Sequence, residues 1–350
     1  MAYTNIDDPS AYFQTKLYTG NGSTQSITND GNSDMQPDLV WIKSRSNASW
    51  NSLQDSSRGA TKTLFSNTTS VEVTYTDAQT SFDSDGFSLG ADASGGSVNV
   101  SSRTYVAWQW KANGGSTSTD TTSSITSTVQ VNSDAGFSIV TYTGDGTTTG
   151  GFGHGLGVAP KVVFVKRRNG AANWCVYHES IGAGFYLQLD TTAAQQSGPW
   201  QNLAPSSTTV IVYGGNLVNG SGDTYVAYCF AEKQGYSKFG KYVGNGSNTD
   251  GAFIYTGFKP AFIIAKRIDA AAHNWFMWDT KRAPFNLVEA VLKPNSSAAE
   301  STLFQIDILS NGFKHYNNYG STNESGGEYI YMAFAENPFV TSTGIPTTAR

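Results

Sequence analysis

The chain has 350 residues, of which 14% are charged and 13% are aromatic, and its formal net charge is −5. The aromatic content excludes a disordered chain, because disordered segments lack the apolar surface needed to fold. The mildly acidic balance, without a run of Lys or Arg, argues against a nucleic-acid partner. The first residues lack the basic and apolar regions of a signal peptide, and no apolar stretch approaches the ~20 residues that cross a bilayer. We therefore expect no signal peptide and no membrane insertion.

Three copies of one pattern follow one another along the chain. Each copy opens with a Tyr and an Asn-Gly or Asp-Gly step, which suits a turn that needs positive φ. These openings are residues 18–22, 142–146 and 242–246. An apolar run follows an X-Pro step and ends in a Lys six residues after the Pro, in residues 37–43, 160–166 and 260–266. Because these runs are continuous rather than alternating, they predict strands that are buried on both faces.

A loop and a Trp follow each apolar run. The residues are Trp50, Trp174 and Trp275, and their distance from the Lys grows from 7 to 8 to 9 residues. A loop that lengthens between flanking positions that stay in frame is typical of a hairpin with a tolerant tip. A Trp in all three copies favours a core position over an exposed platform for sugar rings, because a buried Trp removes a large area from water. Each copy closes on a Tyr-rich strand, in residues 105–111, 225–231 and 329–335.

The pattern predicts an all-β fold of three tandem β-sandwich modules, jelly-roll-like and about 100 residues each. The predicted domains are module 1 with a short N-terminal segment at 1–112, a Ser/Thr/Gly-rich linker at 113–124, module 2 at 125–233, module 3 at 234–337 and an extended tail at 338–350. Modules 2 and 3 should be rigidly coupled, because residues 233–235 alone separate them. Short helical turns are expected at 190–196 and 296–301.

The segments GFSIVTYTGDG, HGLGVAPKVVFVKRR, SGDTYVAYCFAE and YIYMAFAENPF resemble a repeat module common in structural proteins of marine bacteriophages. The resemblance covers nearly the whole chain. It implies a non-enzymatic virion structural protein, assembled in the cytoplasm of the host bacterium. The expected role is a tail fibre or receptor-binding protein that contacts the host surface, and the analogy implies a homotrimer. The expected partners are other virion proteins and a host surface glycan or protein.

Two other functions stay open. One is a capsid decoration or tail-structural protein that binds only other virion proteins. The other is a glycan depolymerase, which would place two carboxylates across a cleft. Asp55, Glu179 and Asp279 follow the repeated Trp by 5, 5 and 4 residues, and Arg58 and Arg282 stand three residues after two of these acids. This repetition favours an ion pair that fixes each hairpin to its neighbour over a catalytic pair.

No catalytic residue, metal or cofactor is predicted. The four histidines do not recur at matching positions, and no G-x-S-x-G nucleophile motif is present; the histidines are His154, His178, His273 and His315. Cys175 and Cys229 lack metal-binding spacing and are expected to be free thiols in strands, with a disulfide between them as the alternative. Asp83 and Asp85 resemble part of a calcium-binding loop. The counterpart in the third copy lacks these acids, which favours a plain turn.

Candidate binding residues lie at the tips between Lys and Trp in copies two and three, residues 168–173 and 268–274. Binding function sits preferentially on such loops, and Arg side chains beside them suit anionic glycans through charge-assisted hydrogen bonds. The predicted residues are Arg167, Arg168, Asn169, Asn173, Arg267, Asp269, His273 and Asn274. The alternative is that these segments are ordinary hairpin tips.

Overall fold

The computed structural model describes residues 2–347 and is all-β. The helical elements in this range are two three-residue 3-10 helices, η1 (Pro9–Ala11) and η2 (Glu179–Ile181). No helix within residues 2–347 has the length and apolar character needed to cross a membrane. The helical turns expected at 190–196 and 296–301 are wrong, because both segments are extended or irregular. Their main chains instead bond to neighbouring parts of the fold, as described below.

The three sequence copies are named repeat 1 (residues 1–112), repeat 2 (125–233) and repeat 3 (234–337). Repeat 1 contains β1 (Phe13–Thr19), β2 (Gln25–Ile27), β3 (Leu39–Ser44), β4 (Asn51–Asp55), β5 (Lys62–Phe65), β6 (Val73–Thr74), β7 (Gln79–Asp83), β8 (Gly86–Leu89) and β9 (Thr104–Trp110). Its main sheet has the order β1-β9-β3-β4-β5-β6, and its small sheet has the order β2-β8-β7.

Repeat 2 and the segment before it contribute β10 (Ser118–Asp120), β11 (Ser127–Asn132), β12 (Phe137–Thr143), β13 (Gly150–Gly153), β14 (Val162–Arg167), β15 (Cys175–His178), β16 (Phe185–Gln188), β17 (Gln196–Ser197), β18 (Thr209–Val212) and β19 (Thr224–Phe230). Repeat 3 contains β20 (Ser237–Val243), β21 (Phe253–Tyr255), β22 (Phe258–Arg267), β23 (Trp275–Asp279), β24 (Ile306–Leu309), β25 (Gly312–His315) and β26 (Glu328–Pro338). Both have a main sheet and a smaller sheet, as repeat 1 does.

The three main sheets share one strand order. The runs β1-β9-β3-β4, β12-β19-β14-β15 and β20-β26-β22-β23 each place an opening strand, a closing strand, the Pro-apolar-Lys strand and the strand after it side by side. The antiparallel register is also shared, since the opening Tyr always faces the first Tyr of the closing strand. These Tyr pairs stack with ring centroids 5.0, 5.0 and 4.9 Å apart.

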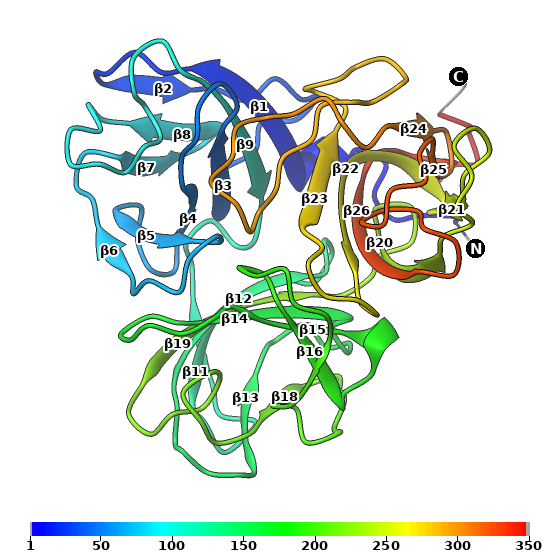
Figure 1. Ribbon diagram of the computed structural model, residues 1–350. Coiled ribbons are helices and arrows are strands. Elements are labelled where there is room, and N and C mark those ends of the chain that lie inside the picture. The colour runs from blue at the N-terminus through cyan, green and yellow to red at the C-terminus, as the bar shows by residue number, and fades with distance from the viewer. Residues whose placement is uncertain (1, 348–350) are drawn as a thin grey trace.

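The central strands of each main sheet are buried on both faces. One face packs against the smaller sheet of its own repeat around a separate apolar cluster. The opposite faces of all three main sheets meet in one central cluster, so the repeats form three lobes around a common centre (Figure 1). Trp110, Phe230 and Phe334, which hold matching positions in the closing strands, touch there with centroids 6.3, 5.6 and 5.8 Å apart. The burial on both faces expected from the continuous apolar runs is confirmed.

The segments outside the repeats are tied to the fold. Residues 113–124, expected as a linker, contain β10, which pairs with β11. Asp38 of repeat 1 also accepts hydrogen bonds of 2.9 Å from the main chain of Gly114 and Gly115. In the C-terminal tail, Ser342 donates its backbone N–H to Asp7 at 2.6 Å. The last three residues of the expected tail, 348–350, lie outside the described residues.

Candidate functional site

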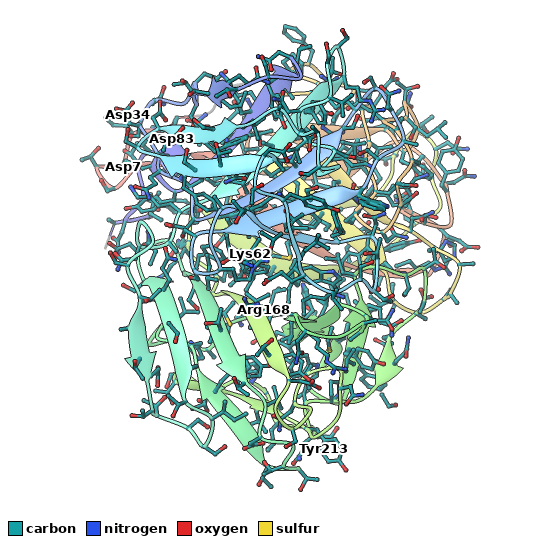
Figure 2. The ribbon with its side chains drawn as sticks, turned by 90° about the vertical axis from the view of Figure 1, so that its left-hand side faces the viewer. Asp7, Asp34, Lys62, Asp83, Arg168 and Tyr213 are labelled. Carbon is teal, nitrogen blue, oxygen red and sulfur yellow. The ribbon has the colours of Figure 1, made fainter. Side chains whose placement is uncertain are left out.

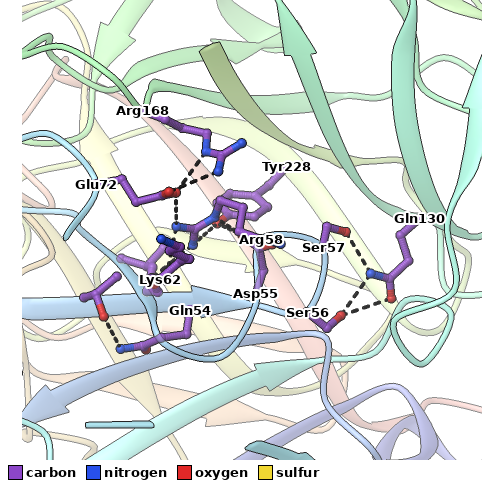
Figure 3. A network of polar contacts seen from close by, with 12 residues as sticks. Gln54, Asp55, Ser56, Ser57, Arg58, Lys62, Glu72, Gln130, Arg168 and Tyr228 are labelled. Carbon is purple, nitrogen blue, oxygen red and sulfur yellow. Dashed lines mark hydrogen bonds and ion pairs between the residues drawn. The ribbon is translucent and has the colours of Figure 1, made fainter. Parts of the chain in front are cut away.

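The junction between repeats 1 and 2, here the 1–2 junction, is built on a buried ion pair. Asp55 ends β4, and Arg58 follows in the next turn, with Arg58 Nε and Asp55 Oδ2 2.5 Å apart and both side chains fully buried. Tyr228 of repeat 2 donates its hydroxyl to the same carboxylate oxygen at 2.7 Å (Figure 3). The Asp-x-x-Arg spacing therefore forms the ion pair that fixes a hairpin to its neighbour, as the repetition predicted.

A second acid extends the 1–2 junction outward. Glu72 of repeat 1 accepts hydrogen bonds from Arg58 at 2.9 Å and from both arms of the Arg168 guanidinium of repeat 2 at 2.9 and 3.0 Å. Glu72 also donates its backbone N–H to the Arg168 carbonyl at 2.9 Å. Burial opposes the ionisation of Glu72, but the two guanidinium groups outweigh it and lower the pKa of Glu72 below its ordinary value.

The junction between repeats 3 and 1, the 3–1 junction, repeats this arrangement. Arg282 Nε lies 2.6 Å from Asp279 Oδ2 in a fully buried pair, and Trp108 of repeat 1 donates its indole N–H to the same oxygen at 3.0 Å. Glu300 takes the place of Glu72, because it binds Arg282 at 3.1 Å and both arms of Arg45 at 2.8 and 3.0 Å. Glu300 also donates its backbone N–H to the Arg45 carbonyl at 2.9 Å.

The junction between repeats 2 and 3, the 2–3 junction, has the same backbone contact without the charges. Gln195 donates its N–H to the Ile268 carbonyl at 3.0 Å. The five charged or polar positions of the 1–2 junction, Asp55, Arg58, Glu72, Arg168 and Tyr228, correspond here to His178, Ile181, Gln195, Ile268 and Met332. Burial lowers the pKa of His178 to about 4, so this imidazole is neutral at pH 7, and its Nε2 lies 3.2 Å from the Tyr331 carbonyl.

The strand register corrects the expected correspondence of Asp55 and Glu179 between repeats 1 and 2. Val162 of β14 faces His178, whereas Leu39 of β3 faces Asp55 in repeat 1. His178 is therefore the counterpart of the repeated acid, and Glu179 lies one position further along. Glu179 forms an ion pair with Lys161 at the surface instead. The expected trio of repeated acids is in fact a pair of acids and a neutral His.

The repeated Trp residues also differ between repeats, because Trp50 of repeat 1 is not placed as Trp174 and Trp275 are. Trp174 and Trp275 are buried and donate their indole N–H groups to the neighbouring repeat, at 2.9 Å to the Phe65 carbonyl and 3.0 Å to the Gln188 carbonyl. Trp50 is 44% exposed, so a core position for it is wrong. Lys43 faces Asn51, whereas Lys266 faces Trp275, which makes Asn51 the structural counterpart of the buried Trp residues. Asn51 donates to the Pro294 carbonyl of repeat 3 at 2.7 Å.

The three lysines that end the Pro-apolar-Lys strands are buried, which the sequence pattern did not predict. Lys43 donates to the carbonyls of Ser49 and Ser297 at 2.7 and 2.9 Å, and so joins its own tip to repeat 3. Lys166 donates to the Ala172 carbonyl and Lys266 to the Arg267 carbonyl. Burial lowers the pKa values of Lys43, Lys166 and Lys266 to about 7, 8 and 8. The signal for this role was the constant Pro-to-Lys spacing, since a surface Lys would not need a fixed place.

The predicted binding residues of the repeat 2 tip lie near the boundary with repeat 1, where Figure 2 shows Arg168. Arg168 is engaged by Glu72, and Arg167 pairs with Asp223 at 2.5 Å. Asn173 donates to Asp190 at 2.9 Å. Asn169 is exposed, although its side-chain oxygen accepts the Thr224 N–H at 3.2 Å.

The predicted residues of the repeat 3 tip form a second, separate group. Arg267 pairs with Asp269 at 2.8 Å and with Glu324, and its guanidinium also lies 3.3 Å from His273. Asn274 accepts a hydrogen bond from Asn295 at 2.8 Å. Asp269 is the exposed member of this group, as Asn169 is at the repeat 2 tip. The structure thus divides the eight predicted residues between two tips, and their role in binding stays a prediction.

Residues 8–338 match the family described as a domain of unknown function, DUF7483. The chain belongs to the DUF7483 family. No curated protein and no solved structure shows a significant match to it.

The other candidate residues of this DUF7483 chain, His154, His315 and Asp83, do not form a common cluster. His154 Nε2 lies 3.2 Å from the Ser206 carbonyl oxygen, and His315 is buried beside Tyr242, with the two ring centroids 5.1 Å apart. Asp83 accepts hydrogen bonds from Ser81 and Ser88 in the turn between β7 and β8. Within residues 2–347, no group of three or more His, Cys, Asp or Glu has a metal-binding arrangement.

Both cysteines of the DUF7483 chain are free and buried, Cys175 in β15 and Cys229 in β19, as predicted. Burial raises the pKa of both thiols. Buried ion pairs, two indoles and the Lys43 ammonium group join neighbouring repeats at the junctions. The junctions thus hold the three repeats together. The tips at residues 168–173 and 268–274 lie beside the junctions and include exposed residues.

Proposed function

We propose that this chain is a non-enzymatic structural protein of a bacteriophage virion that works by binding and assembling. The observation that carries the proposal is the closure of three like sheets around one core through buried junctions. Such closure produces a rigid block whose tips project at defined places, which suits a particle component. The resemblance of the repeated motifs to marine phage structural proteins supports the same role.

We further propose that each repeat is a jelly-roll-like β-sandwich module. The smaller sheet of each repeat packs against one face of its main sheet around an apolar cluster, which supports a sandwich. Excision of repeat 2 together with the preceding segment, as residues 113–233, would test the module as a unit. A soluble fragment with native-like circular dichroism but exposed apolar surface would support it, whereas an unfolded fragment would favour a single indivisible domain.

Within the virion, the proposed role is a tail fibre or receptor-binding protein that touches a host surface glycan or protein. The tips carry this role, and Asn169 and Asp269 are the residues to test, because they are exposed and carry no junction contact. Asn169→Ala with Asp269→Ala should leave the melting temperature nearly unchanged and reduce adsorption of the protein to host cells. Unchanged adsorption would place recognition elsewhere.

The second candidate is a capsid decoration or tail-structural protein that binds only other virion proteins. Within this chain the repeats bury against one another surfaces through which separate subunits could otherwise associate. This favours a single chain at each position in the virion over the homotrimer expected by analogy. Light scattering separates the two, since a homotrimer has three times the 37.4 kDa of the chain. Density in a virion reconstruction would place the protein on the head or the tail, and its absence from purified virions would overturn both candidates. Release of reducing ends from host polysaccharide would instead favour a depolymerase.

A further inference from the structure

A cleft of about 420 Å³ opens between repeats 1 and 3 along the free edge of β1. Its walls include Phe13, Gln14 and Thr15 of β1, and Thr280 and Lys281 from the turn after β23. Among the described residues, β1 pairs with β9 alone and is the edge of its sheet. Such an edge presents unpaired backbone groups that can take up another strand.

In repeat 2 the corresponding edge is already occupied. β11 pairs antiparallel with the opening strand β12, with Gln130 opposite Ile139. The shared register with the closing strand makes Ile139 the counterpart of Thr15. Gln130 is fully buried and donates to Ser56 and Ser57 of repeat 1 at 2.9 and 2.8 Å. β11 thus seals the 1–2 junction from the edge of the sheet.

The cleft at the 3–1 junction is the place that β11 fills at the 1–2 junction. Thr280 and Lys281 follow Asp279 as Ser56 and Ser57 follow Asp55, and they form the wall that a counterpart of Gln130 would reach. Thr15 is 5% exposed, yet its hydroxyl has no hydrogen-bond partner. At the 2–3 junction η2, which follows β15 as the turn with Thr280 and Lys281 follows β23, contacts β20, the counterpart of β1, directly.

We propose that this cleft accepts an extended segment of a partner protein, which adds to β1 as an antiparallel strand in the position that β11 holds in repeat 2. The segment would be uncharged and would carry an amide side chain opposite Thr15, as residues 127–132 do in repeat 2. The proposed virion function supplies the identity of the partner as another assembly protein, but the strand-accepting edge does not depend on it.

An exposed ion pair spans the cleft, and an entering strand can displace it at small cost in free energy. Lys281 of repeat 3 lies 2.9 Å from Asp30 of repeat 1, and their side chains are 44% and 50% exposed. Pairs this exposed stabilise a fold weakly, because water and salt screen them. An entering strand therefore displaces a contact of small free energy, and it gains main-chain hydrogen bonds and a partner for Thr15.

The probe is a capped synthetic peptide with the sequence of residues 125–133, added to the full-length protein. Hydrogen exchange followed by mass spectrometry should show that amides of residues 13–18 exchange about tenfold more slowly with the peptide present. Residues 237–243 of β20 serve as the internal control, because that edge lies against η2, and they should not change. A second peptide carrying Gln130→Pro, which cannot complete a ladder, should protect nothing.

Thr280→Trp blocks the wall of the cleft and should abolish the protection, whereas Thr249→Trp on a remote exposed loop should not. Melting curves of both variants confirm that they fold. Absent protection with the first peptide, or protection that survives Thr280→Trp, overturns the proposal. If the amides of residues 13–18 exchange more slowly as the protein concentration rises, without any peptide, a second copy of the chain is the occupant. This result would overturn the proposal of a partner protein. If the peptide binds but the protein is absent from purified virions, the proposed virion function is overturned. The proposal that β1 accepts a strand is supported in that case.

Discussion

The hydroxyl of Tyr228 in repeat 2 donates a 2.7 Å hydrogen bond to the Asp55 carboxylate in repeat 1, across 173 residues of sequence. The same oxygen binds Arg58 within its own turn. One fully buried carboxylate therefore satisfies a local cation and a distant phenol at once. Burial raises the pKa of Tyr228 well above its ordinary value, so the phenol remains a donor throughout the neutral range.

Tyr228→Phe should lower the free energy of unfolding by about 1–3 kcal/mol, because it removes a buried hydrogen bond to a charged group and keeps the ring. Chemical denaturation followed by fluorescence gives the difference. Tyr213→Phe is the matched control, since Tyr213 is 46% exposed, and it should change stability by less than about 0.5 kcal/mol. Equal effects of the two changes would contradict a structural role for the junction bond.

Arg58→Ile alone should cost about 3–5 kcal/mol, because it leaves Asp55 buried without its cation. Combining Arg58→Ile with Asp55→His, Glu72→Gln, Arg168→Ile and Tyr228→Met copies the 2–3 junction into the 1–2 junction. This combined variant should recover most of the loss, since no unpaired charge stays buried. Lys161→Ile, which breaks a surface pair, is the control and should cost about 0–1 kcal/mol. A combined variant less stable than Arg58→Ile would show that the two junctions are not interchangeable.

Trp174→Ala should destabilise the protein by about 3–5 kcal/mol, since it empties a buried site and removes the bond to the Phe65 carbonyl. Trp50→Ala should cost about 1 kcal/mol or less, because Trp50 is 44% exposed. Differential scanning calorimetry of the two variants compares the same substitution at positions that the sequence makes look equivalent. A larger loss for Trp50→Ala would mean that the register assigned to β4 is wrong.

Acid should destabilise the protein between about pH 6.5 and 3 through its buried histidines His178 and His315. Burial lowers the pKa of His178 to about 4 and that of His315 to about 3. The unfolded chain therefore takes up these protons first as the pH falls, and each residue costs about 2 kcal/mol between pH 7.5 and 5. The melting temperature of the His315→Phe variant should fall less steeply with decreasing pH than that of the unmodified protein. The His273→Gln variant, which changes a half-buried residue, should show nearly the same slope as the unmodified protein. Parallel slopes for all three proteins would refute the assignment.

Native Cys175 and Cys229 should resist thiol reagents at pH 8. Both side chains are fully buried, and burial raises the pKa of Cys229 to about 12, so little thiolate forms. Mass spectrometry after alkylation should find neither residue labelled in the folded protein and both labelled in denaturant. Rapid native labelling would indicate that the sheet around β15 and β19 opens readily.

Local sequence signals predicted a large part of the fold. The all-β class, the free thiols, the double-sided burial of the Pro-apolar-Lys strands and the pairing of Asp55 with Arg58 all follow from neighbouring residues or from spacing. The Trp assignment failed in repeat 1 because Trp50 lies one residue before Asn51, the position that the strand register aligns with Trp174 and Trp275. A one-residue offset in a strand moves a side chain to the opposite face, and the loop length hides such an offset.

The junctions could not be predicted, because their partners lie far apart in the chain. Arg45 and Glu300, for example, are separated by 255 residues and carry no shared motif. The extended segments that hold Glu300 and Gln195 are rich in Ala, Ser and Gln, which favours helix locally. Tertiary contacts with the next repeat override that preference.

The meeting of Trp110, Phe230 and Phe334 at the centre also has a consequence for synthesis on the ribosome. Translation adds about 5–20 residues per second, so roughly 10–45 s separate the appearance of Trp110 from that of Phe334. During that interval the inner face of the first sheet has no partner from repeat 3. A chain interrupted before β26 would keep this apolar surface uncovered, so nascent and truncated forms are the ones that chaperones and proteases should recognise.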